Sequence, residues 1–572
     1  MIQPQGESIS IPTSVQTFFV PKIWVKDNGF LMRSAAPLIE KMAKENYTAS
    51  EAMARFKKEG LVFPPHEQIA ESFYNEILTL EKEGKNGIWA RFLKNAFAPM
   101  IAGKFDYVVG NPPWIRWGYL SQEYRKATLP LWENYGLFSL KGHAARLGGG
   151  EKDFSMLFTY AAIDYYVKDS ARLGFLITQE VFKSKGAGEG FRRFKLGDKE
   201  NFKVIKAHDL VTVQPFEGAA NKTAMIIVKK GDVTNYPVSY TVWTRKKGIG
   251  KIPTDASIDE VLPLLQKKKL IAQPIGSPTG SWQTISSNQK GLKTVEGENA
   301  YKAKLGARVE PYGVFWLSIK EVLSNKDLIV SNQPELGKRK IERVEERIES
   351  DLVFPAVRGS DVERWNATPN IFVLMSQDPI KSEPYTEQHM KKEWPRTYGY
   401  LSRFKSILLT RGSKTVRQFA ERTAFYAMFG IGPYTVARYK VIWKRMANDM
   451  FAAVISQHKT PFGFKTIIPT DTTSLFATDN EAEAHYLCAI INSTPVREFI
   501  KSYSSAGRGF GAPSVMDHVG IPKFDPKNKL HRKLSELSKT LHELKAERNL
   551  TDVEKYEKEV DEAVCELFGI EA

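Results

Sequence analysis

The sequence predicts an α/β fold built around a parallel sheet, followed by a mixed α+β region and a helical C-terminal end. Three observations predict it. From residue 103 onward, apolar runs alternate with helical segments, which is typical of a parallel sheet covered on both faces. Beyond about residue 245 the alternation stops, and short strands, basic clusters and aromatic residues follow. The last segment returns to leucines spaced three and four apart, as on one packed helix face.

Residues 1–102 are predicted to form a strand and helices that pack on the domain that follows. The strand-like run is "VQTFFVPKIWV". The helical segments are "AAPLIEKMAKENY", "ASEAMARFKKEG" and "HEQIAESFYNEILTLEKEG". In the last of these, Ile69, Phe73 and Ile77 recur at helical spacing, so this face is expected to be buried.

Residues 103–245 are predicted to form the sheet domain. Its expected strands are "FDYVV", "RLGFLIT" and "KVIKAHDL", and its expected helices are "DFSMLFTYAAIDYYVKD" and one that begins in "GEGFRRFKL". The runs "KTAMIIVKKG" and "PVSYTVWTRK" have no helix between them, which predicts an antiparallel hairpin.

Three further segments complete the predicted organisation. Residues 246–280 are rich in Gly, Pro and Ser and are expected to be a linker. Residues 281–525 are expected to form a second domain of short strands. Residues 526–572 are expected to form two helices that pack on each other, the first through Leu530, Leu534, Leu537, Leu541 and Leu544.

The charge of the chain favours a polyanionic partner. Its 572 residues include 82 Lys and Arg against 65 Asp and Glu, a formal net charge of +17. Such a surplus is compatible with simple solubility. In a large protein with 42% hydrophobic and 12% aromatic residues, however, nucleic acid is the leading candidate.

Cysteine usage and the N-terminal stretch indicate the compartment. Only Cys488 and Cys565 occur, which excludes a disulfide framework and a cysteine-based zinc site. The nine histidines are scattered without metal-ligand spacing, so no metal is expected. The N-terminal stretch lacks the features of a signal peptide, and no apolar run has the length of a membrane span. We therefore expect a cytoplasmic protein without membrane contact.

The tetrapeptide Asn111-Pro112-Pro113-Trp114 directly follows the strand "FDYVVG". The carboxyl edge of a parallel sheet is where such folds bind ligands, and proline fixes φ, so the backbone carbonyls there have set directions. One interpretation is only a proline-stiffened turn with a structural tryptophan, because short motifs often match by chance. The context favours a site, since a second turn, "VQPFEGAANKTAMIIVKKG", brings Phe216 about a hundred residues later.

The residue types suit methyl transfer to an exocyclic amine. The lone pair of such an amine is delocalised into its ring, so the amine is a poor nucleophile. The Asn111 side-chain oxygen and the Pro112 carbonyl can accept its hydrogens and pull it towards tetrahedral geometry. Trp114 offers a flat face to an extruded base. Neither a metal nor a strong general base is required.

These segments together resemble the N6-adenine DNA methyltransferases. "FDYVVGNPPW", "DFSMLFTYAAIDYY", "GFLITQEVF" with "GFRRF", and "FEGAANKTAMIIV" match motifs IV to VIII of that family in order. The likeness is greatest to type IIG restriction–modification enzymes and related phage-defence methylases. It implies a partial Rossmann-like methyltransferase sheet, a target-recognition domain over residues 281–525, and terminal helices.

The resemblance also implies residue roles. Asn111 and Pro112 would hold the target amine, Pro113 would shape the turn, and Trp114 would stack on a flipped adenine whose other face or edge Phe216 contacts. Asparagine in the first position favours adenine N6, whereas cytosine N4 enzymes usually carry serine there. Asparagine also occurs in methylases of protein glutamine and of ribosomal RNA guanine. The length and charge of this chain argue for double-stranded DNA.

One expected motif is missing. The family binds S-adenosylmethionine through a glycine-rich loop that normally precedes the Asn-Pro-Pro-Trp strand, and residues 1–104 contain no such loop. The glycine clusters "LGGGEKD" and "KGAGEGF" both come after that strand. A diverged or circularly permuted loop is the alternative. We expect instead that a partner chain carries the S-adenosylmethionine-binding half.

Cations near flexible backbone are the expected DNA contacts of the second domain. They are Arg411, Lys414 and Arg417 in "TRGSKTVRQF", Arg438 and Lys440 in "VARYKVIWKRM", and Arg508 in "YSSAGRGFGAPS". The segment "KRKIERVEER", in contrast, alternates its charges and is interpreted as an ordinary solvated helix.

The sequence thus predicts a site-specific DNA adenine-N6 methyltransferase chain of a restriction–modification or phage-defence system. It would use S-adenosylmethionine and need a partner chain to bind it. A non-catalytic DNA-recognition subunit with a vestigial tetrapeptide is the first alternative, and an RNA methyltransferase is the second. No P-D-x-D/E-x-K signature is evident at the N-terminal end, so cleavage would require another subunit.

Overall fold

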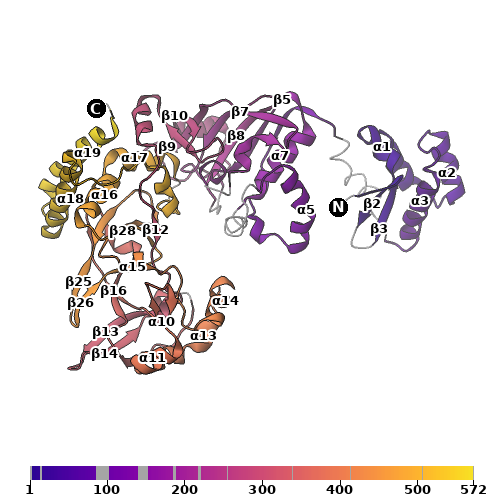
Figure 1. Cartoon of the computed structure of the whole chain (residues 1–572). Coiled ribbons are helices and arrows are strands. Elements are labelled where there is room, and N and C mark those ends of the chain that lie inside the picture. The colour runs from indigo at the N-terminus through magenta and orange to yellow at the C-terminus, as the bar shows by residue number, and fades with distance from the viewer. Residues whose placement is uncertain are drawn as a thin grey trace. The chain divides into compact units, whose positions relative to one another are not determined.

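The chain consists of two compact units in the computed structural model (Figure 1). Unit 1 comprises Met1–Val181 and Glu189–Lys268, and unit 2 comprises Phe182–Gly188 and Lys269–Ala572. The structure describes residues 3–12, 16–85, 102–138, 152–184, 188–216, 221–253, 255–337, 339–412, 414–504 and 507–570.

The N-terminal part of unit 1 has a core of its own. Its elements are the antiparallel strands β1 (Gln3–Gln5), β2 (Ser8–Pro12) and β3 (Thr17–Pro21), and the helices α1 (Lys22–Lys44), α2 (Ala49–Lys58) and α3 (Glu67–Lys82). Trp24 is fully buried, 5.8 Å from the ring of Phe73. The three predicted helices are confirmed. The predicted strand is shorter than the run suggested, because α1 begins directly after Pro21, whose fixed φ is compatible with a helix start.

The sheet of unit 1 combines parallel and antiparallel pairs. Its strands are β4 (Phe105–Gly110), β5 (Val167–Thr178), β7 (Glu200–Asp209), β8 (Thr223–Lys230) and β9 (Val238–Arg245), with β6 (Lys195–Leu196) beside β7. The order is β9-β7-β8-β5-β4. β4 is parallel to β5 and β9 is parallel to β7, whereas β8 is antiparallel to both of its neighbours.

Two predictions for this domain are wrong. The runs expected to form a hairpin are β8 and β9, and they do not pair with each other but flank β7 on opposite sides. The helix expected in "GEGFRRFKL" is a single 3₁₀ turn (Phe191–Arg193) followed by β6. The turn ends at Phe194, whose φ of 48° is left-handed. Its start at Gly190 lies against backbone, since an added Cβ would be 2.5 Å from the Leu137 carbonyl oxygen.

Helix α7 (Phe154–Tyr166) packs on one face of this sheet. The same part of the chain contains α5 (Gln122–Asn134), the short α8 (Glu180–Lys183) and a 3₁₀ turn at Trp117–Tyr119. Figure 1 shows α7 beside β5. The ring of Tyr160 on α7 lies 5.0 Å from that of Phe202 on β7, and both residues are fully buried. The same face of β5 and β8 is also fully buried, with Leu173 and Ile226 at 0% exposure.

The opposite face of the sheet is more exposed to solvent. Gly174 and Leu176 of β5 and their β8 partners Ile227 and Met225 are only half-buried. Next to them on β4, Val109 pairs with Gly174 and is exposed. An apolar pattern on both faces is typical of a sheet with a layer on each side, yet only one side is buried by the described residues.

Unit 2 contains a four-stranded sheet of order β12-β28-β22-β24 and a six-stranded sheet of order β15-β14-β13-β19-β16-β27. Its strands are β11 (Trp282–Ile285), β12 (Lys304–Leu305), β13 (Trp316–Val322), β14 (Leu328–Asn332), β15 (Glu345–Ile348), β16 (Val353–Val357), β17 (Val362–Glu363), β18 (Asn366–Ala367), β19 (Ile371–Leu374), β20 (Gln377–Asp378), β21 (Glu383–Pro384), β22 (Tyr439–Lys444), β23 (Met446–Ala447), β24 (Ala452–Ile455), β25 (Gln457–Thr460), β26 (Gly463–Thr466), β27 (Ile468–Pro469), β28 (Thr473–Thr478) and β29 (Gly507–Arg508). β10 (Leu265–Pro274) runs across the boundary between the units.

The helices of unit 2 are α10 (Tyr312–Phe315), α11 (Glu387–Glu393), α12 (Pro395–Arg403), α13 (Lys405–Leu409), α14 (Lys414–Arg422), α15 (Pro433–Val436), α16 (Glu481–Asn492), α17 (Thr494–Tyr503), α18 (Lys529–Glu547) and α19 (Leu550–Phe568). The predicted terminal helices are confirmed, and Leu534 and Leu541 are fully buried in the same core as β22 and α16. The helix predicted for "KRKIERVEER" is wrong: its end belongs to β15, which pairs with β14 at the sheet edge. No helix in the described parts combines the length and apolar character of a membrane span.

Candidate target-base site

The tetrapeptide leaves the sheet at the carboxyl end of β4. The last β4 pair is Gly110 with Phe175 of β5. A Cβ on Gly110 would lie 3.0 Å from the Phe175 ring, so glycine allows the strand end to lie on that ring. Pro112 is buried, whereas Asn111 and Pro113 are exposed. The amide of Asn111 is therefore open to a ligand at the sheet edge.

Trp114 and Phe216 lie together although a hundred residues separate them. Their ring centroids are 5.4 Å apart with an interplanar angle of 77°. The Trp114 indole Nε1 donates a hydrogen bond of 3.3 Å to the Leu176 carbonyl on β5, and both rings are half-buried. An edge-to-face pair is a favoured aromatic arrangement, and here it forms a corner between two ring planes 77° apart.

The N-terminal end of α7 holds the segment that follows the tetrapeptide. Trp117 N–H donates to the Lys152 carbonyl at 2.8 Å, and Phe154 N–H donates to the Ile115 carbonyl at 2.8 Å. Asp153 caps α7 by accepting from Ser155 N–H at 2.9 Å. Burial raises the pKa of Asp153 to about 6. Sequence reasoning missed this cap, although Asp153 directly before an apolar helix is a recognisable cap signal.

Asp209 anchors the loop that carries Phe216. Its Oδ2 accepts from the Gln179 amide at 2.5 Å and from the Tyr240 hydroxyl at 2.9 Å, and its Oδ1 accepts from Val211 N–H at 3.0 Å. Burial and the Asp209 carboxylate raise the pKa of Tyr240. The network ties the carboxyl ends of β5 and β7 to the loop start. It was also missed, because nothing local in the sequence links its members.

In the described parts of the chain, no strand pairs with the outer edge of β4. The glycine cluster "KGAGEGF" follows β5, the strand parallel to β4, and part of it lies outside the described residues. The strands that precede β4 form the separate antiparallel sheet β1-β2-β3. The described residues also form no cluster of three or more His, Cys, Asp or Glu side chains suited to a metal ion. The site therefore presents the exposed Asn111 beside the ring pair of Trp114 and Phe216.

Two of the six expected DNA cations are internal. Arg411 is 4% exposed, and its guanidinium donates to the carbonyls of Leu408, Phe425 and Ala427. Lys440 lies on β22 inside its sheet with no exposed surface, and its ammonium donates to the Ala437 carbonyl at 2.8 Å. Burial lowers the pKa of Lys440 to about 7. These contacts give both side chains a structural role, and we do not retain them as DNA contacts.

The other four cations differ among themselves. Arg417 is half-buried and donates to the Arg411 carbonyl at 2.7 Å. Arg438 is exposed and lies over the ring of Tyr439, 5.5 Å from its centroid. Lys414 and Arg508 have described backbones on α14 and β29, but their side chains lie outside the described part. Arg417 and Arg438 remain available for phosphate contacts.

A cavity of about 770 Å³ in unit 2 is lined by arginines that the sequence analysis did not identify. Besides Arg411, its lining includes Arg308, Arg339 and Arg445, together with the carboxylates of Glu310 and Asp471. Arg308 pairs with Glu310 at 3.1 Å, and the other two donate to main-chain carbonyls. The arginines come from distant segments, so no sequence window indicated the cluster.

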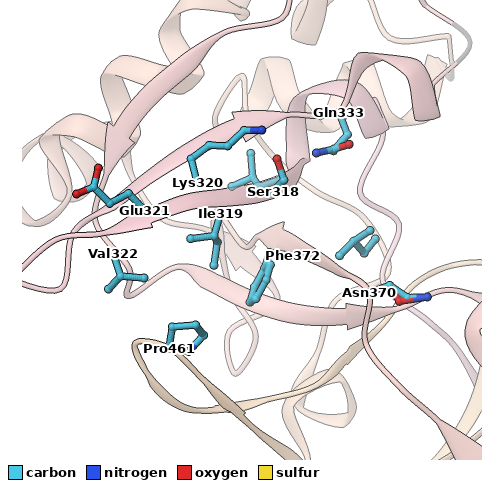
Figure 2. A pocket seen from close by; sticks show the side chains of 11 residues that line it. Ser318, Ile319, Lys320, Glu321, Val322, Gln333, Asn370, Phe372 and Pro461 are labelled. Carbon is cyan, nitrogen blue, oxygen red and sulfur yellow. The ribbon is translucent and has the colours of Figure 1, made fainter.

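Figure 2 shows a second cavity of unit 2, of about 580 Å³, beside β13. β13 and β19 pair only at Trp316 and Leu317, and the cavity opens where they diverge. Ile319, Phe372 and Pro461 give it an apolar lining. Lys320 and Glu321 add opposite charges, so this cavity lacks the positive character that a phosphate backbone needs.

Comparisons with known proteins agree with this architecture. The model of the Eco57I restriction-modification methylase family matches residues 31–216, a range that includes the tetrapeptide and ends at Phe216. A search of curated proteins gives no match.

Solved structures of restriction-modification enzymes match this chain to different degrees. The type IIL enzyme MmeI, solved in complex with DNA, matches with a TM-score of 0.50 and 13% identity over 82% of this chain and 55% of MmeI. The type IIG endonuclease BpuSI matches at 13% identity over 82% and 55%, with a TM-score of 0.26. The type ISP enzyme LlaBIII, bound to DNA, matches at 10% identity over 80% and 30%, with a TM-score of 0.38. The chain thus spans about half the length of MmeI and BpuSI, is similar in fold to MmeI, and matches a methylase family model over residues 31–216.

Proposed function

We propose that this chain supplies the target-base side of a site-specific DNA adenine-N6 methyltransferase in a restriction–modification or phage-defence system. The methyl group would come from S-adenosylmethionine and the acceptor would be an adenine extruded from double-stranded DNA. The observation that carries the proposal is the position of Asn111-Pro112-Pro113-Trp114 at the carboxyl end of a parallel strand, with Phe216 against Trp114. The family match over the same residues supports it.

Asn111 and Pro112 would orient the amine. The Asn111 side-chain oxygen accepts one amino hydrogen and the Pro112 carbonyl accepts the other, so the nitrogen becomes more tetrahedral and its lone pair points away from the acceptors. Buried Pro112 keeps its carbonyl fixed, while exposed Asn111 remains accessible to the base. Acceptors that strengthen as charge develops on nitrogen lower the barrier, and no strong base is involved.

Trp114 and Phe216 would hold the extruded base. A purine can stack on one ring face while its edge meets the other ring, since the two planes are 77° apart. The Trp114 bond to Leu176 and the Asp209 network fix the two rings from separate strands. The corner therefore exists before a base arrives, which reduces the ordering cost of binding.

Unit 2 would read the DNA. Exposed Arg438 and half-buried Arg417 are its best-placed cations. Guanidinium groups suit both phosphates and the guanine edge, so they can supply affinity and some sequence readout. The DNA-bound relatives of similar fold are consistent with this role.

Genomic methylation tests the proposal. The chain is expressed with its neighbouring genes in a host without adenine methylation, and N6-methyladenine is mapped by sequencing. We expect methylation in one short sequence, and Asn111→Ala should reduce its rate by about 10² or more while DNA binding persists. Asn134→Ala, an exposed asparagine at the end of α5, is the matched control.

Two results would point to other functions. Sequence-specific DNA binding without methylation, unchanged by Asn111→Ala, would favour a recognition subunit with a vestigial tetrapeptide, which the missing cofactor loop makes the main alternative. Methylated adenine found in RNA and not in DNA would favour an RNA methyltransferase.

A further inference from the structure

The cavity of about 770 Å³ in unit 2 brings together segments that are far apart in the sequence. Its volume lies within the range of roughly 300–1,000 Å³ that is typical of small-molecule sites. The lining comes from the end of β12, the start of α10, the turn between β22 and β23 and the loop before β28. The cavity is therefore a product of the fold of unit 2 and not of a single loop.

The lining of the cavity has more cations than carboxylates. Besides the buried Arg411, it contains Arg308, Arg339 and Arg445 against Glu310 and Asp471. Arg339 donates only to the carbonyls of Ile407 and Thr410, which are neutral, so its hydrogen bonds are satisfied while its charge is not compensated. Burial also raises the pKa of the Asp471 carboxyl. A concave surface with such a surplus of positive charge attracts anions.

Two of these arginines have N–H groups that bind no other described residue. Arg445 is half-buried, and its hydrogen bond among the described residues is the 3.1 Å donation from Nη1 to the Asp471 carbonyl. Arg308 pairs through Nη2 with Glu310 at 3.1 Å, while its buried Nε has no partner. A guanidinium is a planar fork of N–H donors that matches a phosphate. Arg445 can therefore bind a phosphate through Nε and Nη2 without losing its present bond.

The rest of the lining suits a flat ring that carries an amino group. Leu305, Leu336 and Met446 give the cavity an apolar wall. Asp471 is 9% exposed, and its Oδ1 accepts from the Tyr312 hydroxyl at 3.0 Å, whereas its Oδ2 accepts from no described residue. A buried acceptor favours a ligand that donates to it, as the amino groups of guanine, adenine and cytosine do. An apolar wall, an acceptor and a phosphate fork together match a nucleotide.

Two segments expected to contact DNA border this cavity. Arg417 of "TRGSKTVRQF" donates to the carbonyls of Arg411 and Gly412, and both of those residues line the cavity. Elsewhere in the lining, Met446 of β23 pairs with Arg508 of "YSSAGRGFGAPS" on β29. A DNA strand bound by these segments therefore lies beside the cavity.

We propose that the cavity binds one nucleotide, whose phosphate contacts Arg445 and Arg308 and whose base packs on the apolar wall. A nucleotide offers the same chemistry inside a DNA strand and in free form, and the bordering segments favour the strand. A base in this cavity is unpaired, so it comes from a single strand or is extruded from a duplex. The inference goes beyond methyl transfer and does not depend on the tetrapeptide, because no residue of unit 1 takes part.

Calorimetry with the full chain tests the site. The probes are dGMP and inorganic phosphate, each titrated separately. We expect dGMP to bind about tenfold more tightly than phosphate or better, because its base also removes apolar surface of the wall from water.

Two substitutions locate the ligand. Arg445→Met removes the phosphate fork and should weaken dGMP binding about tenfold, as expected for a hydrogen bond to a charged group. Arg532→Met makes the same change at an exposed residue of α18 and should have no effect. Met446→Glu adds a carboxylate to the cavity wall and should weaken binding of the anionic ligand by a similar factor. Because Met446 is 62% exposed, this variant should melt at the parent temperature, which separates lost binding from misfolding.

A labelled single-stranded oligonucleotide, followed by fluorescence anisotropy, identifies the source of the nucleotide. If Arg445→Met and Met446→Glu weaken its binding as much as that of dGMP, the nucleotide belongs to a DNA strand. If they weaken dGMP binding alone, the site holds and its ligand is a free nucleotide. Phosphate binding as tight as dGMP binding would reduce the cavity to a simple anion site and overturn the inference. Unchanged dGMP affinity in both variants would overturn it as well, whatever the outcome for adenine methylation.

Discussion

In both units, some side chains have a burial opposite to the one that their residue type suggests. In unit 2, Arg411 and Lys440 have the charge expected of DNA contacts, yet both are buried and bonded to main-chain carbonyls. In unit 1, Tyr107 and Val109 have the character of buried strand residues, yet both are exposed. Unit 2 therefore satisfies these two cations internally, whereas unit 1 leaves these apolar side chains of β4 exposed. Residue type alone gives neither result.

The comparison implies that only surface cations of unit 2 contribute to DNA affinity. Affinity for duplex DNA should fall by about 10³ between 50 and 200 mM salt, because bound cations release counterions from the phosphates. Arg438→Ala should reduce the slope of log affinity against log salt by about 1, and Lys440→Met should leave it unchanged. Fluorescence anisotropy titrations at several salt concentrations measure this. A slope near zero would remove nucleic acid as the partner.

Removing an internal cation should cost stability in place of affinity. Arg411→Met leaves three main-chain carbonyls without their donor, and we expect unfolding of unit 2 to become easier by about 3 kcal/mol. Arg438→Met is the control, since an exposed arginine should contribute within about 0.5 kcal/mol. Denaturant unfolding of the full chain measures both. Equal losses for the two variants would mean that Arg411 is not the internal anchor that its bonds indicate.

The buried Lys440 should make the stability of unit 2 depend on pH. Burial lowers the pKa of Lys440 to about 7 in the folded chain, whereas the unfolded chain keeps the ordinary value near 10.5. Between these values the unfolded state binds more protons, so the free energy of unfolding rises with pH and is lost as pH falls. Lys440→Met should remove about 2 kcal/mol of that rise between pH 7 and 9.

The measurement is the difference in unfolding free energy between parent and variant across that pH range. Lys459→Met, which removes an exposed lysine from β25, should leave the pH profile of the parent intact. A parallel profile for Lys440→Met would show that the Lys440 ammonium is solvated.

Local signals were sufficient for some elements and not for others. An apolar run that stops at Gly110 before two prolines placed the tetrapeptide correctly at a strand end, because turn chemistry is local. The spacing of Leu534 and Leu541 likewise predicted a buried helix face. Strand pairing is not local: β8 inserts between β5 and β7, and no feature of "KTAMIIVKKG" specifies that neighbour. The burial of Lys440 follows from the central position of β22, which sequence alone does not give.

The candidate site divides in the same way. Asn111 and Trp114 were identified from a motif, and Phe216 from the resemblance to a family. Asp153 was missed because helix caps are common and carry no functional signal. Asp209 was missed because its partners Gln179 and Tyr240 come together only when three strands align.

The smallest expected effect concerns the ring pair of Trp114 and Phe216 in unit 1. The substrate is a duplex whose target adenine faces an abasic site, and the protein is the cofactor-loaded complex. Trp114→Ala and Phe216→Ala should each weaken binding to this duplex by about tenfold, because stacking on one aromatic is worth roughly 1–3 kcal/mol. Binding to an intact duplex should change less, because the energy of base extrusion offsets part of the stacking. Tyr119→Ala removes an aromatic that is 81% exposed just beyond the tetrapeptide and should affect neither duplex. Equal losses on both duplexes would mean that the 5.4 Å ring pair only supports the turn, and the corner would then belong to the fold and not to the base.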